Sequence, residues 1–191
     1  MQVMTMSTQN HSKLQELDAA IRRLKGENPD ADATSLILAT LRTAKDKDEQ
    51  TYLLSSLASE YQSLGKLPEA EEAIRNQINL APDSPDGWIQ LAGHLYRYAK
   101  DLPKALSTVE LAVTKALVNG HFVRQALAER IRIALDMKNY PIVEASMLKL
   151  IEYVPKPGSL DVRLETDFLT RIPVGTISIE IVEKYRKLSG Q

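Results

Sequence analysis

Hydrophobic residues recur along most of this chain with the roughly 3.6-residue spacing of amphipathic helices. Near the N-terminus this spacing predicts a helix from Lys13 to Lys25, which ends at Gly26 to Pro29. A second helix is predicted from Ala33 to Ala44, where Asp30 or Asp32 can cap the first turn. The pattern therefore indicates an all-α chain.

The residues from Tyr52 to Pro82 are followed by a second copy of the same pattern. Four residues recur 34 positions later: Leu54, Leu57, Ala58 and Tyr61 return as Trp88, Leu91, Ala92 and Leu95. The next block, Lys66 to Ala70, returns as Asp101 to Ala105 at an offset of 35, which indicates one inserted residue between the blocks. A period of about 34 residues is typical of stacked helix-turn-helix arrays.

With a third and weaker copy, the repeats predict three pairs of helices. They run from Asp48 to Leu64, Pro68 to Leu80, Pro85 to Lys100, Pro103 to Val118, Phe122 to Met137 and Pro141 to Tyr153. Proline begins the second helix of each pair, where its missing N–H costs no hydrogen bond. Asn119 and Gly120 end the fourth helix, because both tolerate the left-handed conformation.

Small side chains occupy the points where the helices of the first two pairs would cross. These side chains are Ala58 with Ala70 and Ala92 with Ala105. In the third pair Ile131 and Val143 take their places. Helices approach closely only where the contacting side chains are small, a condition that the alanines of the first two pairs meet.

These positions resemble the tetratricopeptide repeat (TPR) family. The residues that carry the resemblance are large, small and turn residues: Tyr61, Gly65, Ala70, Pro82, Trp88, Leu91, Ala92 and Ala105. The resemblance covers roughly Thr51 to Pro155 and is weakest in the third copy. It implies a right-handed helical solenoid that serves as a protein-binding scaffold, and by itself it implies no chemistry.

We expect one elongated domain with four parts. These are a disordered tail at residues 1–12, a divergent helix pair at 13–46 that caps the array, TPR-like repeats at 47–155, and a C-terminal loop with a capping helix at 156–191. One face of the last helix is predicted to consist of Ile177, Ile181, Tyr185 and Leu188. This helix is expected to cap the array, and the alternatives are that it lies in the groove or pairs with a second copy.

The composition argues against several kinds of chemistry. There is no cysteine, hence no disulfide, thiolate nucleophile or cysteine-based zinc site. His11, His94 and His121 are too scattered for a metal motif, and we interpret His94 as a surface or groove residue. No phosphate-binding glycine loop or nucleophile elbow occurs. We therefore predict a protein that is not an enzyme and has no cofactor.

The charge and hydropathy of the chain indicate which kinds of partner it can bind. The formal net charge is −1 with both signs interspersed, which does not favour nucleic acid. No apolar run approaches the ~18 residues of a membrane span, and the first residues lack a leader pattern. We expect a cytoplasmic protein that binds neither nucleic acid nor membrane.

Trp88 is interpreted as a packing residue, and Glu71 as an ion-pair partner of Arg75.

In the TPR family, residues at fixed positions of each first helix line a concave groove. Carried over position by position, the resemblance implies a groove of Tyr52, Ser55, Ser59, Gln62, Ile89, Gly93, Tyr96, Arg97, Gln125, Ala128 and Arg132. Members that grip the C-terminal carboxylate of chaperones have lysine and asparagine where this chain has Ser55 and Ser59, which argues against that function. Tyr96 and Arg97 are the strongest candidates, because tyrosine and arginine often dominate binding energy.

The predicted function is a non-catalytic scaffold or adaptor that binds a peptide or helix of another protein in this groove. The alternative is an accessory or regulatory domain that works mainly as a homodimer through its terminal helices. Such a dimer would bury Ile177, Ile181 and Tyr185.

Overall fold

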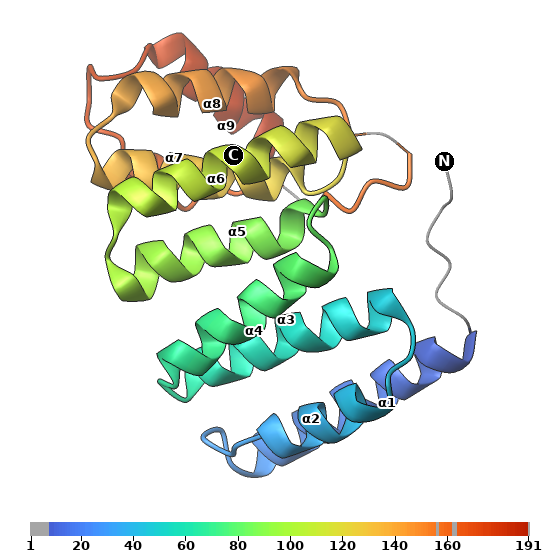
Figure 1. The fold of residues 1–191 in the computed structure, drawn as a ribbon. Coiled ribbons are helices and arrows are strands. Elements are labelled where there is room, and N and C mark those ends of the chain that lie inside the picture. The colour runs from blue at the N-terminus through green and yellow to red at the C-terminus, as the bar shows by residue number, and fades with distance from the viewer. Residues whose placement is uncertain (1–7, 156, 162–163, 191) are drawn as a thin grey trace. The chain divides into compact units, whose positions relative to one another are not determined.

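The structure is a computed structural model that describes residues 8–155, 157–161 and 164–190, with side chains from Lys13 onward. Within this described part the chain forms nine α-helices and two short helical turns, and no strand (Figure 1). The predicted all-α class is therefore confirmed. Residues 1–7 of the predicted disordered tail lie outside the described residues, and the prediction is wrong for residues 8–12, which form the start of the first helix.

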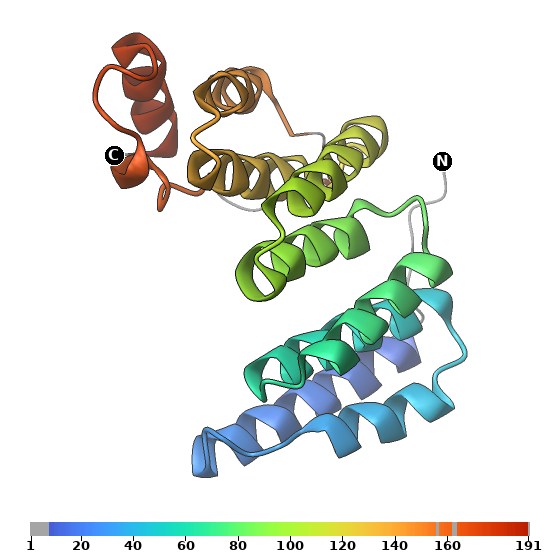
Figure 2. The same cartoon turned by 60° about the vertical axis from the view of Figure 1, so that its left-hand side comes forward.

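The chain forms two compact units, which we call the N-terminal unit, Met1–Pro82, and the C-terminal unit, Asp83–Gln191. The boundary falls between the first and second predicted repeats. The N-terminal unit contains four helices, α1 (Thr8–Glu27), α2 (Thr34–Thr43), α3 (Lys47–Ser63) and α4 (Leu67–Leu80). Each helix packs against the next one along the chain (Figure 2).

The C-terminal unit contains the other two repeats and the end of the chain. Its elements are α5 (Pro85–His94), a π-helical turn η1 (Leu95–Ala99), α6 (Leu102–Asn119), α7 (Val123–Asp136), α8 (Tyr140–Glu152), a 3₁₀ turn η2 (Leu169–Arg171) and α9 (Ile179–Ser189). Consecutive helices pack together, and α5 also contacts α7, the first helix of the next pair. This is the contact expected between stacked pairs.

Helix starts and ends follow the predicted signals. Proline lies in the first turn of α4, α6 and α8, as expected. Ser84 caps α5 by accepting a hydrogen bond from the backbone N–H of Asp86 at 3.4 Å. Gly120 closes α6 with φ +72°. These local signals decide where each helix begins and ends, because helix ends need partners for their free backbone groups.

The predicted crossing residues are all fully buried. Ala58, Ala70, Ala92 and Ala105 each have 0% exposure, and α3 packs on α4 as α5 packs on α6. Ile131 and Val143 are also at 0% in the third pair, where α7 packs on α8. The cores of the pairs are therefore built from the residues that the repeat pattern indicates.

A buried carboxylate that the sequence does not single out holds the N-terminal unit together. Glu60 of α3 pairs with Lys25 Nζ of α1 at 2.7 Å and accepts the backbone N–H of Ala33 at 2.9 Å. Ala33 precedes α2 and gives no side-chain cap of its own. Asp32 accepts hydrogen bonds from the side chain and backbone of Thr34, which lower the pKa of Asp32 to about 2. Glu60 and Asp32 together satisfy the start of α2.

The inserted residue of the second repeat appears as the π-helical turn η1. A π turn accommodates one extra residue within a helix, and such turns are frequent at functional sites. The backbone N–H of Asp101 reaches the carbonyl of Leu95 at 3.1 Å and closes the widened turn. The turn carries Tyr96 and Arg97, so the insertion sets the orientation of these two predicted groove residues.

The first helix of each repeat pair is followed by a residue in the left-handed region. These residues are Gly65 at φ +71°, Lys100 at +57° and Lys138 at +55°. Only glycine adopts this region without cost, because a Cβ crowds the backbone there. The first repeat therefore ends its first helix with less strain than the other two.

Gly65→Ala is expected to lower the free energy of unfolding by about 1 kcal/mol through backbone strain alone. No atom lies within 4 Å of a Cβ built at Gly65, so no collision contributes. Gly26→Ala is the matched control, since Gly26 lies inside α1 with equally open surroundings. That change is expected to raise the same quantity by roughly 0.5 kcal/mol. Urea unfolding followed by far-UV circular dichroism measures both, and equal effects would contradict the strain argument.

Candidate partner-binding surface

The predicted groove residues of the first repeat lie on α3 in the N-terminal unit. Tyr52 is exposed, and its hydroxyl donates to both carboxylate oxygens of Asp18 on α1 at 3.0 Å. Partial burial and this hydrogen bond raise the pKa of Tyr52. The hydroxyl of Ser59 donates to the carbonyl of Ser55 at 3.1 Å, and Gln62 is half-buried. This face of α3 is polar and uncharged.

The remaining predicted residues lie in the C-terminal unit, on α5 with η1 and on α7. Arg97 is exposed, and Gly93 and Ala128 are buried. The half-buried residues are Ile89, Tyr96, Gln125 and Arg132. Two of these positions, Arg97 and Arg132, are brought to one point by a residue that sequence reasoning missed.

That residue is Glu129 of α7, which is only 4% exposed. Its Oε1 accepts from Arg97 Nη1 at 2.8 Å, and its Oε2 accepts from Arg132 Nη1 at 3.2 Å. A buried carboxylate is stable only when it is paired, and Glu129 is paired with two guanidinium groups. The i,i+3 spacing of Glu129 and Arg132 is the only signal of this pair in the sequence.

The outer side of Arg132 binds a segment that follows α8. Asp167 accepts from Arg132 Nε at 3.0 Å and from Nη2 at 2.8 Å, and Glu165 pairs with Nη2 as well. Burial opposes the charge of Arg132, but the hydrogen bonds to Asp167 and Glu165 outweigh it and raise the Arg132 pKa. The same hydrogen bonds lower the pKa of Asp167. The guanidinium fork is thus filled by three carboxylates.

The beginning of this segment is bound at the start of α7. Gln125 Nε2 donates to the carbonyl of Leu160 at 3.0 Å, and the N–H of Leu160 donates to His121 Nδ1 at 3.2 Å. Asp161 accepts the backbone N–H of Arg124 at 2.6 Å. Asp161 thereby caps α7, whose own N-cap residue supplies no side-chain hydrogen bond.

The end of the segment is bound at the other end of α7. Asp136, the last residue of α7, accepts from the Tyr96 hydroxyl at 2.6 Å and pairs with Arg171. Partial burial, together with the hydrogen bond to Asp136, raises the pKa of Tyr96. The described residues 159–161 and 164–171, which we call the C-terminal segment, therefore contact α7 from its first turn to its last.

An apolar anchor fixes the C-terminal segment. Phe168 is fully buried and Leu169 nearly so, and the ring centroids of Phe168 and Tyr185 lie 5.6 Å apart. The Tyr185 hydroxyl donates to the carbonyl of Glu165 at 2.7 Å. Burial raises the pKa of Tyr185, with the charge of Glu165 adding to the shift.

The last helix packs on α8, where a capping helix is expected, but its buried face differs from the predicted one. Ile177 and Tyr185 are buried as predicted, and Ile181 is half-buried. Leu188 is 52% exposed, and Val182 and Ser189 face inward. The helix begins at Ile179, so Ile177 lies before it and cannot share its face in helical register.

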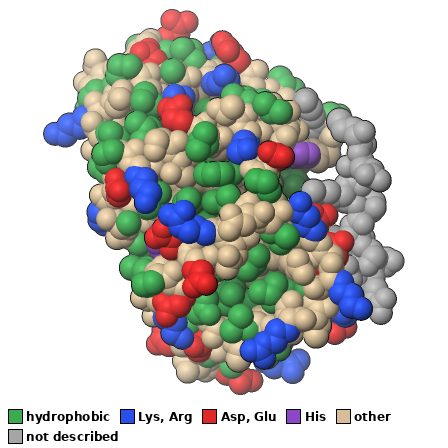
Figure 3. Space-filling model, viewed as in Figure 1, with side chains coloured by type: hydrophobic (Ala, Val, Ile, Leu, Met, Phe, Trp, Pro, Cys, Tyr) green, Lys and Arg blue, Asp and Glu red, His purple; other side chains and the backbone are tan. Residues whose placement is uncertain are grey.

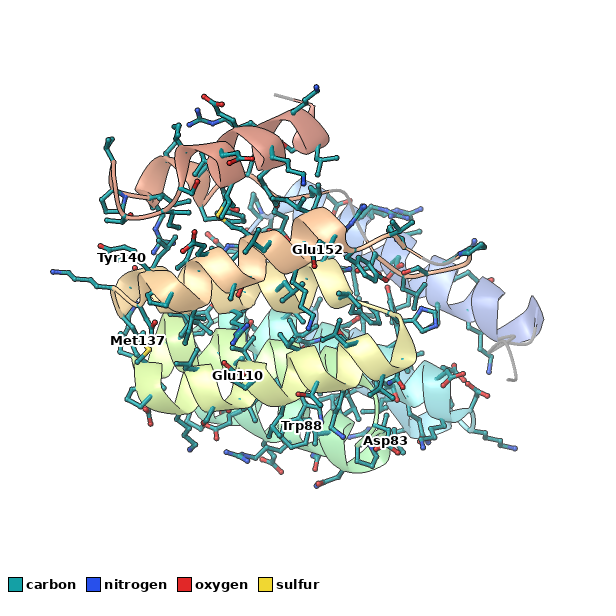
Figure 4. All side chains as sticks on the ribbon, turned by 90° about the horizontal axis from the view of Figure 1, so that it is seen from above. Asp83, Trp88, Glu110, Met137, Tyr140 and Glu152 are labelled. Carbon is teal, nitrogen blue, oxygen red and sulfur yellow. The ribbon has the colours of Figure 1, made fainter. Side chains whose placement is uncertain are left out.

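The surroundings of three residues can be compared with their interpretation from the sequence. His94 was assigned to the surface or groove and is instead buried, with its ring centroid 5.5 Å from that of Tyr98. Trp88 is half-buried on α5, and Lys115 Nζ lies 5.8 Å from its ring centroid and 3.4 Å from Asp83 Oδ1 (Figure 4). Glu71 pairs with Arg75 at 2.6 Å, as predicted.

Gly93 is the residue that lets Arg97 reach Glu129. A Cβ built at Gly93 would collide with Arg97 Nη2 and come within 3.0 Å of Glu129 Oε1. The guanidinium group therefore lies directly against the α5 backbone. This position needs glycine for a close approach of side chains and not for its backbone angles.

The surface seen in Figure 3 mixes acidic, basic and apolar side chains without a large area of one sign. Among the described residues, no group of three or more histidine and acidic side chains has a metal-binding arrangement. In the same part of the chain, no helix is long and apolar enough to cross a membrane.

No protein-family model and no curated protein sequence matches this chain. Among solved structures, it is similar to the crystal structure of BtubC (BKLC) from P. vanneervenii, with a TM-score of 0.59 and 14% sequence identity. The likeness covers 98% of this chain and 85% of that chain. At this level of identity the two proteins share a fold, and nothing about function follows from it.

Gly93→Ala is expected to lower the free energy of unfolding by roughly 1 kcal/mol. The gain in helix propensity is about 1 kcal/mol, but it is outweighed by loss of the Arg97 hydrogen bond to a buried carboxylate, about 2 kcal/mol. In an Arg97→Ala background the collision is absent, so the same change should stabilise. Urea unfolding followed by Trp88 fluorescence tests this reversal of sign, and additive effects would contradict it.

Asp161→Ala is expected to lower the free energy of unfolding by about 1 to 2 kcal/mol, because α7 loses its cap. Tyr153 and Ser159, which also donate to Asp161, lose an acceptor. Glu183→Ala on the exposed face of α9 is the matched control and should change stability by less than about 0.5 kcal/mol. Unfolding monitored by Trp88 fluorescence distinguishes the two, and equal effects would mean that Asp161 is not a cap.

Proposed function

We propose that this protein is a non-catalytic scaffold or adaptor, built as a TPR-like helical solenoid, that binds a peptide or helix of a partner protein. The repeat period, the prolines of α4, α6 and α8, and the buried alanines at the helix crossings support a TPR-like array. Arrays of this kind present helix faces to extended ligands.

The observation that carries the proposal is that α7 already binds a stretch of the chain that lies outside the α-helices, the C-terminal segment. Gln125 and Arg132, both predicted to contact a partner, bind a main-chain carbonyl and two carboxylates of that segment. Recognition of a peptide requires both kinds of contact, to the main chain and to side chains. This face of the C-terminal unit therefore has the chemistry of a peptide-binding surface.

The N-terminal unit offers a different surface for the same function. The α3 face presents the Tyr52 ring and the Ser59 hydroxyl with no charged group among the predicted positions. Such a face suits a neutral or amphipathic segment, in contrast to the ionic contacts of α7. Tyrosine is enriched among residues that carry binding energy, which favours Tyr52 as a contact.

Perturbed ionisable groups do not favour catalysis here. Asp167 and Glu165 raise the pKa of Arg132, and Arg132 lowers the pKa of Asp167. The pKa of Tyr185 is raised mainly by burial. Perturbed groups at a catalytic site face a substrate cavity. Each of these groups is instead occupied by a neighbour from the same chain.

The homodimer alternative has less support. Two of the side chains that such a dimer would bury, Ile177 and Tyr185, are 7% and 0% exposed within a single chain. Their apolar area has already left water, so a second copy gains little from contacting them. We therefore place the scaffold function first.

The scaffold function is tested by affinity capture from a lysate of the source cell with quantitative mass spectrometry. Two variants each block one face, Ser59→Trp on α3 and Tyr96→Ala with Arg97→Gln on η1. Ser107→Trp on α6 is the matched control, because Ser107, like Ser59, is exposed and its hydroxyl bonds only to its own helix. A partner retained by the intact chain and the control should fall at least about tenfold with one blocking variant. Equal capture by all variants would refute the proposed faces, and absence of any partner would refute the scaffold function.

A further inference from the structure

The main chain of the C-terminal segment is held more firmly than the two acidic side chains, Glu165 and Asp167, that pair with Arg132. Phe168 and Leu169 are buried, and the carbonyl of Glu165 is bound by Tyr185, so the main chain of the segment is fixed. The carboxylates are partly open to water, with side-chain exposures of 33% for Glu165 and 57% for Asp167, whereas the Arg132 side chain is 18% exposed. The two side chains can therefore turn away from Arg132 while the segment stays in place.

The exchange costs little, because an incoming carboxylate restores the hydrogen bonds that Glu165 and Asp167 release, and water and salt partly screen the more exposed pair with Asp167. Glu129 is different, since its side chain is 6% exposed and is held by both Arg97 and Arg132. Glu129 stays paired in either state, whereas Glu165 and Asp167 compete with any carboxylate from outside.

When Glu165 and Asp167 turn away, two guanidinium groups, those of Arg97 and Arg132, surround one carboxylate. The side chain of Arg97 is 49% exposed and that of Arg132 would gain exposure. The site then has a net charge of about +1, and its free N–H groups lie in the planar fork that binds one carboxylate through two parallel hydrogen bonds. Asp167 itself shows this geometry, with bonds to Nε and Nη2 of Arg132.

We propose that Arg132, with Arg97 beside it, is a binding site for an acidic segment of a partner protein, and that Glu165 and Asp167 occupy the site until the partner arrives. The partner presents two side-chain carboxylates separated by one residue, as Glu165 and Asp167 are. This inference rests on the proposed scaffold function and specifies the partner of its α7 face. A partner must bind Arg132 tightly enough to displace Glu165 and Asp167, so these two residues limit which partners can bind.

The test uses the full chain and a fluorescent peptide of residues 164–172, with an amide control peptide in which its two acidic residues are replaced by glutamine and asparagine. Binding is measured by fluorescence anisotropy. The variant Glu165→Gln with Asp167→Asn removes the internal competitors and should bind the acidic peptide about tenfold more tightly than the unchanged protein. The matched control, Glu180→Gln with Glu183→Gln, removes two exposed carboxylates from α9 and should not tighten binding.

Arg132→Gln in the competitor-free variant should abolish the tighter binding, and Arg132→Lys should retain part of it, because lysine keeps the charge but not the fork. The amide peptide should bind no variant tightly, and added salt should weaken the acidic peptide. Circular dichroism and Trp88 fluorescence verify that each variant is folded.

The inference is overturned if the competitor-free variant binds no more tightly than the unchanged protein, or if binding is insensitive to Arg132. A partner captured from lysate whose binding survives Arg132→Gln would leave the scaffold function standing and remove this site. Specific peptide binding without any captured partner would support the site and count against the scaffold function.

Discussion

A single buried carboxylate, that of Glu129, constrains the arrangement of side chains on one face of the C-terminal unit. A carboxylate that is 4% exposed must be paired, because an unpaired buried charge costs several kcal/mol. The two partners are Arg97 of η1 and Arg132 of α7. Arg97 reaches Glu129 because Gly93 has no side chain in the way. Arg132 binds Glu129 through Nη1, and its Nε and Nη2 groups point to the C-terminal segment. Helix packing, ion pairing and the position of the segment are thus coupled through one group.

The C-terminal segment combines two kinds of interaction with different strengths. Phe168 and Tyr185 bury apolar area, which stabilises the attachment of the segment. Glu165 and Asp167 make ion pairs that are partly open to water, with side-chain exposures of 33% and 57%. One stretch of chain thus combines an apolar anchor, Phe168, with charged side chains that pair with Arg132.

Much of the fold was predictable because its determinants are local. Proline in the first turn, Ser84 as a cap and Gly120 as a stop act within a few residues of their own position, and each behaves as expected. The offset of 35 between repeat blocks indicated an insertion, which the structure accommodates as the π turn η1. The buried face of α9 was predicted less well, since Ile177 precedes the helix and Leu188 faces water. A short helix on the end of an array is oriented by what it covers, and its own period does not contain that information.

The sequence by itself determined the helical class, most helix boundaries and the small residues at the crossings, because spacing and capping are properties of neighbouring residues. The start of α1 is an exception, because the helix begins at Thr8 and not at Lys13. It also indicated Gln125, Arg97 and Arg132 as surface positions through the repeat pattern. Only the tertiary structure decided which charges meet. Glu60 binds the backbone of Ala33, 27 residues earlier in the sequence, and Arg132 binds Asp167, 35 residues later. The spacing of residues within a helix gives no information about partners so far apart in the sequence. Ion pairs of this kind depend on how helices stack, so the chemistry of the surface follows from the fold and cannot be read before it.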